Sequence, residues 1–128
     1  MIEMTLHELE KETDNKLRWD ADVGEALFEL YIPKWRVPTP WPLKILVKID
    51  SVQTGLITNE ACNKGNDKAL SIIAIAEKYK KHTKTVRYIP VGEKQDWEIG
   101  EPYIPYSLLP ESADRIQITV NWDIDSAR

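Results

Sequence analysis

The sequence has few of the residues that mark catalytic, metal-binding or secreted proteins. It has one cysteine, Cys62, so no disulfide can form within the chain, and its two histidines, His7 and His82, are far apart. The G-x-S-x-G, H-E-x-x-H, C-x-x-C, G-x-G-x-x-G and Walker motifs do not occur. The sequence places neither histidine beside Cys62, so we expect this residue to be packed rather than nucleophilic. These absences favour a non-catalytic protein without a cofactor or a metal.

Long apolar runs are also absent. No segment approaches the roughly 18 apolar residues that a membrane-spanning helix requires. The first twelve residues carry acids where a signal peptide would carry lysines, and they lack its apolar core. The chain has 128 residues, of which 42% are hydrophobic and 30% charged, so we predict a single domain over residues 1–128. We expect a cytoplasmic protein with no membrane partner.

Charge is unevenly distributed along the chain. The net charge of −4 divides into −6 over residues 1–30, +7 over residues 31–87 and −5 over residues 88–128. The most basic run is KYKKHTKTVR, residues 78–87, and Tyr79 and Tyr88 lie within or beside it. Basic and aromatic residues together are typical of nucleic-acid contacts. However, the acidic chain as a whole opposes phosphate binding, so we expect the ends to neutralise the middle and nucleic acid to be a disfavoured partner.

Strict alternation of apolar and polar residues is the clearest structural signal. It predicts strands over residues 16–23, 25–32, 43–50, 83–91 and 115–125. Alternation before a turn at 13–16 indicates that the N-terminal segment forms a hairpin with the first of these strands. A short N-terminal helix is the competing interpretation, because Thr5 and Glu8 have the spacing of a capping box.

One helix is predicted, near residues 67–82. Its apolar residues form two adjoining stripes, Asn66 or Asp67 can cap its start, and lysines crowd its end, where His82 would complement the helix dipole. The segments 51–66 and 92–114 are predicted to be loops. The fold class expected is therefore α+β, with a mainly antiparallel sheet of about five to six strands packed against this principal helix.

The stretch YIPKWRVPTPWP, residues 31–42, holds four of the eight prolines and two of the five tryptophans. Strands are predicted on both sides of it, and proline stiffens the chain, so we interpret it as a rigid hairpin bend. Tyr31, Trp35 and Trp41 would cluster there with Arg36 alongside. Such a cluster can close the end of a core, or it can be a binding surface, because Trp, Tyr and Arg are favoured interface anchors.

The pattern W-D-x-D occurs twice, at Trp19–Asp22 and at Trp122–Asp125. On a strand, each copy would direct its aromatic ring inward and two carboxylates outward. If the two strands were neighbours, four carboxylates could bind calcium or magnesium. We expect instead two separate solvated faces and no metal.

The function predicted is that of a non-catalytic binding or interaction module whose partner is another protein or a second copy of the chain. Its surface is predicted to consist of Tyr31, Trp35, Arg36 and Trp41, with a second patch at Tyr103 and Tyr106 in the loop EPYIPYSLLP. The alternative is a small-molecule-binding α+β domain, an enzyme among the options, with a pocket between the helix and a curved sheet.

Overall fold

The computed structural model describes residues 3–24, 26–52, 71–109 and 114–123, and it consists almost entirely of strands. The strands are β1 (Glu3–Glu12), β2 (Lys16–Val23), β3 (Ala26–Pro33), β4 (Lys44–Ser51), β5 (Ser71–Lys81), β6 (Thr85–Pro90), β7 (Tyr103–Pro105) and β8 (Arg115–Asp123). Among the described residues, short 3-10 turns lie between strands at η1 (Lys34–Arg36), η3 (Lys94–Asp96) and η4 (Tyr106–Leu108).

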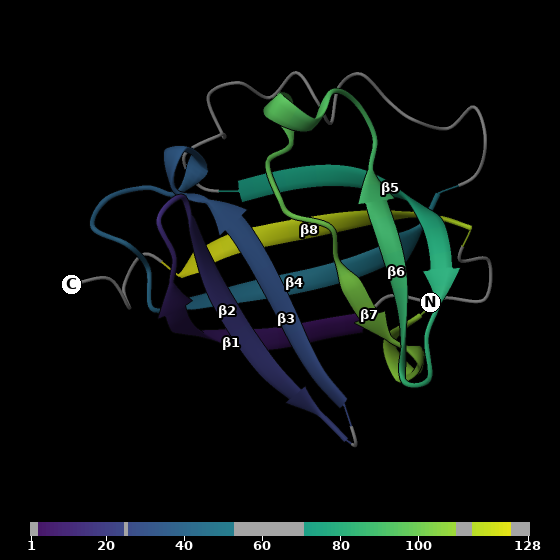
Figure 1. Cartoon of the computed structure of the whole chain (residues 1–128). Helices are drawn as coiled ribbons and strands as arrows, with labels where there is room; N and C mark the ends of the chain where they lie inside the picture. The colour runs from purple at the N-terminus through teal and green to yellow at the C-terminus, as the bar shows by residue number, and fades with distance from the viewer. Residues whose placement is uncertain (1–2, 25, 53–70, 110–113, 124–128) are drawn as a thin grey trace.

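All eight strands belong to one antiparallel sheet, in the order β3-β2-β1-β4-β8-β5-β6-β7. The sheet curls until its two end strands, β3 and β7, come into contact, which gives a nearly closed barrel (Figure 1). Just before β7, the Gly100 N–H donates a hydrogen bond to the Tyr31 carbonyl of β3, at 2.7 Å. Curling into a barrel hides most of the sheet edge that an open sheet would leave unpaired.

The predicted principal helix at residues 67–82 is wrong, and with it the α+β class and the pocket between helix and sheet. Residues 71–81 form β5, which lies between β8 and β6. The described residues contain no α-helix, and the sheet has eight strands rather than five or six. The run SIIAIA explains the error, because a short apolar run has no clear period and its isoleucines favour strands.

The N-terminal hairpin is confirmed, and its helical alternative is not. β1 pairs with β2 along its second half and with β4 along its first half. The Thr13 hydroxyl accepts a hydrogen bond from the Lys16 N–H, at 3.0 Å, and so closes the turn between β1 and β2. The strands predicted at 16–23, 25–32, 43–50, 83–91 and 115–125 are present as β2, β3, β4, β6 and β8.

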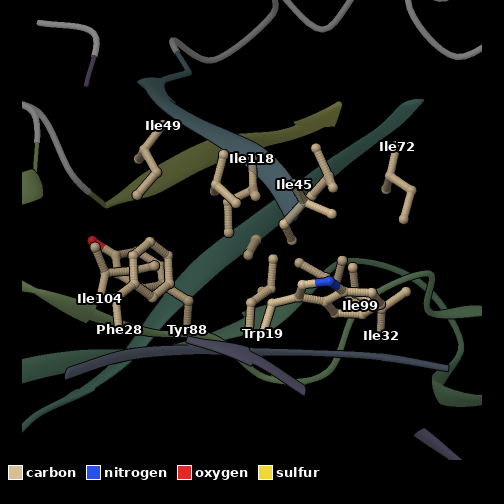
Figure 2. Packing of buried hydrophobic residues seen from close by; sticks show 14 of the residues in the cluster. Trp19, Phe28, Ile32, Ile45, Ile49, Ile72, Tyr88, Ile99, Ile104 and Ile118 are labelled. Atoms are coloured by element: carbon tan, nitrogen blue, oxygen red, sulfur yellow. The ribbon is translucent and has the colours of Figure 1, made fainter. Parts of the chain in front are cut away.

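The core fills the inside of the barrel, as the alternation predicts. Side chains from β2, β3, β4, β5 and β6 converge there, with Trp19, Phe28 and Tyr88 the largest that are fully buried (Figure 2). The rings of Trp19 and Trp122 lie 6.0 Å apart, and the Trp19 indole N–H donates to the Pro42 carbonyl at 3.1 Å. His7 is also buried, with its ring edge-on to Phe28 at 4.5 Å.

The outer face of β1 to β4 is not covered by the described part of the chain. Leu6, Leu27 and Leu46 lie on it and are 50%, 45% and 38% exposed. Asp20 and Asp22 do not gather with Asp123, because β1 and β4 separate β2 from β8, and Asp125 lies outside the described residues. Asp20 instead contacts Arg18 at 2.9 Å, and the described residues contain no cluster of metal-ligating side chains.

The Pro-Trp stretch is not a hairpin bend. β3 pairs with β2, and β4 pairs with β1 and β8, so the segment between them crosses the end of the barrel to a non-adjacent strand. It begins with η1 and includes a cis peptide bond between Thr39 and Pro40. Alternation identifies strands but not their order, so a crossing connection and a hairpin bend have the same sequence pattern.

Candidate binding groove

A groove lies at the end of the barrel where the β1–β2 turn, η1 and η3 come together. Its volume is about 370 Å³, near the lower end of the roughly 300–1,000 Å³ that is typical of ligand pockets. Two tryptophans from different connections, Trp35 and Trp97, line it together with Pro33, Ile99 and Gly100. The groove therefore has aromatic sides and a largely apolar lining at the rim of a rigid sheet.

Trp35 is the exposed centre of an anchored turn. Its neighbour Lys34 binds the Glu12 carboxylate at 2.6 Å, and its other neighbour Arg36, whose side chain is only 8% exposed, binds Glu98. Trp35 itself is 64% exposed. Because both neighbours are held by ion pairs, the backbone at Trp35 is fixed. The Trp35 ring itself does not cover the core.

Trp97 follows η3 and was not among the residues predicted for the site. Its indole N–H donates a hydrogen bond to the Gly92 carbonyl at 3.1 Å, which fixes the ring against its own loop. The ring is half-buried and lines the groove. The only signal in the sequence was a tryptophan in a loop rich in turn-forming residues, and nothing there placed it near Trp35.

The base of the groove coincides with the seam between β3 and the chain before β7. Gly100 packs so closely there that a Cβ atom would lie 3.2 Å from the Tyr31 Cβ and 3.9 Å from the Lys16 Nζ. The missing side chain allows the Gly100–Tyr31 hydrogen bond to form. It also brings the Lys16 ammonium to the base of the groove.

The groove carries more positive than negative charge. Lys16, Lys34 and Lys94 line it, and Asp14 is its acid. Lys34 is neutralised by Glu12, whereas Lys16 and Lys94 form no ion pair with any other described residue. Aromatic sides, an apolar base and two uncompensated amines fit a ligand that combines an aromatic or apolar group with an anion.

Of the first predicted patch, only Trp35 presents its ring to the groove. Arg36 positions Trp35 through Glu98, and Trp41 is partly buried against the core with the Lys34 ammonium 5.5 Å from its ring. Trp41 therefore plugs the end of the core.

Tyr31 lies on the outer face of β3, away from Trp35 and Trp41. Its hydroxyl interacts with Arg18, and this hydrogen bond is the main reason that the pKa of Arg18 is raised, followed by Asp20 and Glu29. Arg18 also contacts Glu29 at 3.1 Å, so Tyr31 belongs to a polar network on the outer face.

Tyr103 and Tyr106 lie at the opposite end of the barrel. Tyr103 begins β7 and Tyr106 begins η4, near the β2–β3 and β5–β6 turns. They are 40% and 44% exposed. The two predicted patches are thus separate surfaces, one at each end.

Comparisons with known proteins give no indication of function. No protein-family model, no curated protein and no solved structure matches the chain. In the described residues, there is no helix with the length and apolar character needed to cross a membrane.

Proposed function

We propose that this chain is a binding module whose groove accepts an aromatic group next to a negative charge, presented by a partner protein. The observation that carries the proposal is that the exposed, anchored Trp35 lines one groove together with Trp97, Lys16 and Lys94, and that these two lysines form no ion pair with any other described residue. An acidic segment with an aromatic side chain has the matching chemistry.

Preorganisation supports this use of the groove. Lys34, Arg36 and Trp97 are each fixed by hydrogen bonds or ion pairs, so little side-chain freedom remains to be lost on binding. Exposed tryptophans next to fixed polar groups are typical anchors of protein interfaces. Lys16 and Lys94 would add orientation, because each can pair with an anion without first breaking an ion pair to a described residue.

A small probe tests the groove without a known partner. Naphthalene-1-sulfonate combines a fused aromatic ring with an anion, and 1-naphthalenemethanol is its neutral counterpart. We expect the sulfonate to bind more tightly, and we expect Trp35→Ala to weaken its binding by about fivefold or more, as for an interface anchor. Isothermal titration calorimetry measures both affinities.

Matched variants control for non-specific binding through surface charge or hydrophobic surface. Lys16→Gln and Lys94→Gln should each weaken sulfonate binding and leave the alcohol unaffected, whereas Lys48→Gln on β4 should change neither. Tyr79→Ala at the other end of the barrel should also leave sulfonate affinity unchanged. Equal binding of the sulfonate and the alcohol, or equal loss in the Lys48 variant, would contradict the proposal.

A second copy of the chain is the other partner to test, because the exposed Trp35 ring could enter the groove of a neighbour. Light scattering on the wild type and on a folded Trp35→Ser variant distinguishes the two cases. A dimeric wild type and a monomeric variant would make the groove a subunit interface. Two monomers would leave a separate partner protein as its occupant.

A further inference from the structure

A ladder of aromatic rings and cations lies on the outside of the barrel at the end opposite the groove. The Arg87 guanidinium carbon lies 4.8 Å from the centre of the Tyr79 ring and 5.9 Å from the centre of the Tyr103 ring. The ring of His82 continues the series, 5.5 Å from Tyr103. Tyr79, 59% exposed, and His82, also exposed, thus occupy the two ends of the ladder.

The register of the strands positions the side chains of this ladder. Register pairs Lys80 with Arg87 and Arg87 with Tyr103, so these three side chains lie side by side on β5, β6 and β7. The register shifts between Lys78 and Lys80, and Tyr79 occupies this irregularity with its ring beside Arg87. The Arg87 guanidinium is held by Glu101, whose hydrogen bond is the main reason that the pKa of Arg87 is raised.

The hairpin that carries the ladder is strongly basic. Residues 78–87 contain four lysines, one arginine and no acid. Lys78 pairs with Asp114 at 2.8 Å, whereas Lys80, which shares the outer face with Arg87, forms no ion pair with any described residue. Lys81 also forms none, but it pairs in register with the buried Val86 and therefore belongs to the other face of the sheet. Although the whole chain is acidic, charges more than about 8–10 Å away are largely screened at physiological salt, so the local excess decides which ligand approaches.

A hollow of about 280 Å³ adjoins the β5–β6 turn at this end of the barrel. Thr83, Lys84, Tyr106 and Ser107 are among the residues that line it. The Tyr106 hydroxyl donates to the His82 carbonyl at 2.7 Å, which ties the turn to η4. Aromatic rings and cations are therefore brought together at one end of the sheet.

We propose that the Tyr79–Arg87–Tyr103–His82 ladder binds single-stranded nucleic acid, with bases stacked on the exposed rings and a phosphate bound by Lys80. Open aromatic faces accept any base, and a cation beside them follows the backbone, which is how single strands are bound without sequence preference. An acidic protein would pair with the same lysine, but it would not present a flat base next to every phosphate.

Fluorescence anisotropy with labelled dT12 tests the proposal. Tyr79→Leu should weaken binding by about 5-fold to 100-fold, the loss of one stacked base, while Tyr79→Phe keeps the ring and should remain within about twofold. Lys80→Gln should lower the slope of log affinity against log salt by about 0.7, the value for one phosphate contact to a single strand.

Two controls separate base stacking from simple attraction between charges. A twelve-residue abasic strand has the same phosphates and no bases, and it should bind at least about fivefold more weakly than dT12. Trp35→Ala, in the groove at the other end, should leave dT12 affinity unchanged, so this test is independent of the groove. Equal binding of the two strands would overturn the proposal in favour of a polyanion or an acidic protein. Absence of dT12 binding at 50 mM salt would overturn it outright.

Discussion

Trp19 and Trp35 show two opposite uses of the same side chain within sixteen residues of sequence. Trp19 is fully buried inside the barrel, and its indole N–H is bonded to the Pro42 carbonyl. Trp35 is 64% exposed on an anchored turn and lines a groove. Strand alternation fixes the first position, whereas the ion pairs of Lys34 and Arg36 fix the second. The interior rings therefore hold the fold together, whereas the Trp35 ring stays accessible at the rim.

The largest expected effect is on the stability of the interior. Replacing Trp19 in Trp19→Ala removes the largest fully buried side chain and leaves a cavity, which should lower the free energy of unfolding by about 3–5 kcal/mol. Trp35→Ala should stay within about 0.5 kcal/mol, as is usual for surface positions. Urea denaturation followed by circular dichroism measures both. Similar losses of stability in the two variants would contradict the distinction between the buried Trp19 and the exposed Trp35.

The buried Tyr88 extends the comparison between buried and exposed side chains to alkaline pH. Burial, and secondarily the Asp114 carboxylate, raises the pKa of Tyr88 to about 12 from an ordinary value of 10.0. The unfolded chain therefore loses this proton first, so the stabilisation is complete below pH 10 and declines as the pH rises toward 12. Over that interval, the free energy of unfolding should fall by roughly 2–3 kcal/mol on account of this group.

Comparison of variants isolates the contribution of Tyr88 from other groups that titrate in the same range. Tyr88→Phe should flatten the alkaline dependence of stability relative to the wild type. Urea denaturation at several pH values between 9 and 12 measures the slopes. An unchanged slope in the Tyr88 variant would show that the buried hydroxyl is not responsible.

A smaller effect on stability is expected at Gly100, in the seam between β3 and the chain before β7. In Gly100→Ala, the new methyl group would meet the Tyr31 Cβ at 3.2 Å and force β3 and the segment before β7 apart. We expect a loss of about 1 kcal/mol or somewhat more, the usual cost of overpacking, together with faster hydrogen exchange at the amide of residue 100. Normal exchange at that amide would mean that the seam yields without breaking its hydrogen bond.

Much of the strand content could be predicted from the sequence, because period-2 alternation reports directly on a half-buried sheet. Trp19, Phe28 and Trp122 lie inside as their strands require. β5 could not be predicted in the same way, since Ile73 and Ile75 face outward while remaining half-buried, which obscures the period. Strand order was also inaccessible, because it depends on pairings between residues far apart in the sequence.

The candidate groove could be predicted only in part. Composition singled out Trp35, but Trp97 and Lys16 join it through the closure of the barrel, which no local pattern encodes. Trp41 and Arg36 were selected for the same reasons as Trp35, yet Trp41 packs against the core and Arg36 is nearly buried in an ion pair. Residue type suggests which side chains can bind, whereas burial decides which of them are exposed to do so.

The most direct test of the two roles of tryptophan is a spectrum that resolves the five indole N–H groups of the chain by ¹H–¹⁵N NMR. Naphthalene-1-sulfonate would be added to the wild-type protein, with assignments taken from single Trp→Phe variants. The predicted result is that the signals of Trp35 and Trp97 shift together with one affinity, while those of Trp19 and Trp122 stay in place. Shifts confined to the interior indoles, or no shift at Trp35, would contradict the assignment of the groove as a binding site.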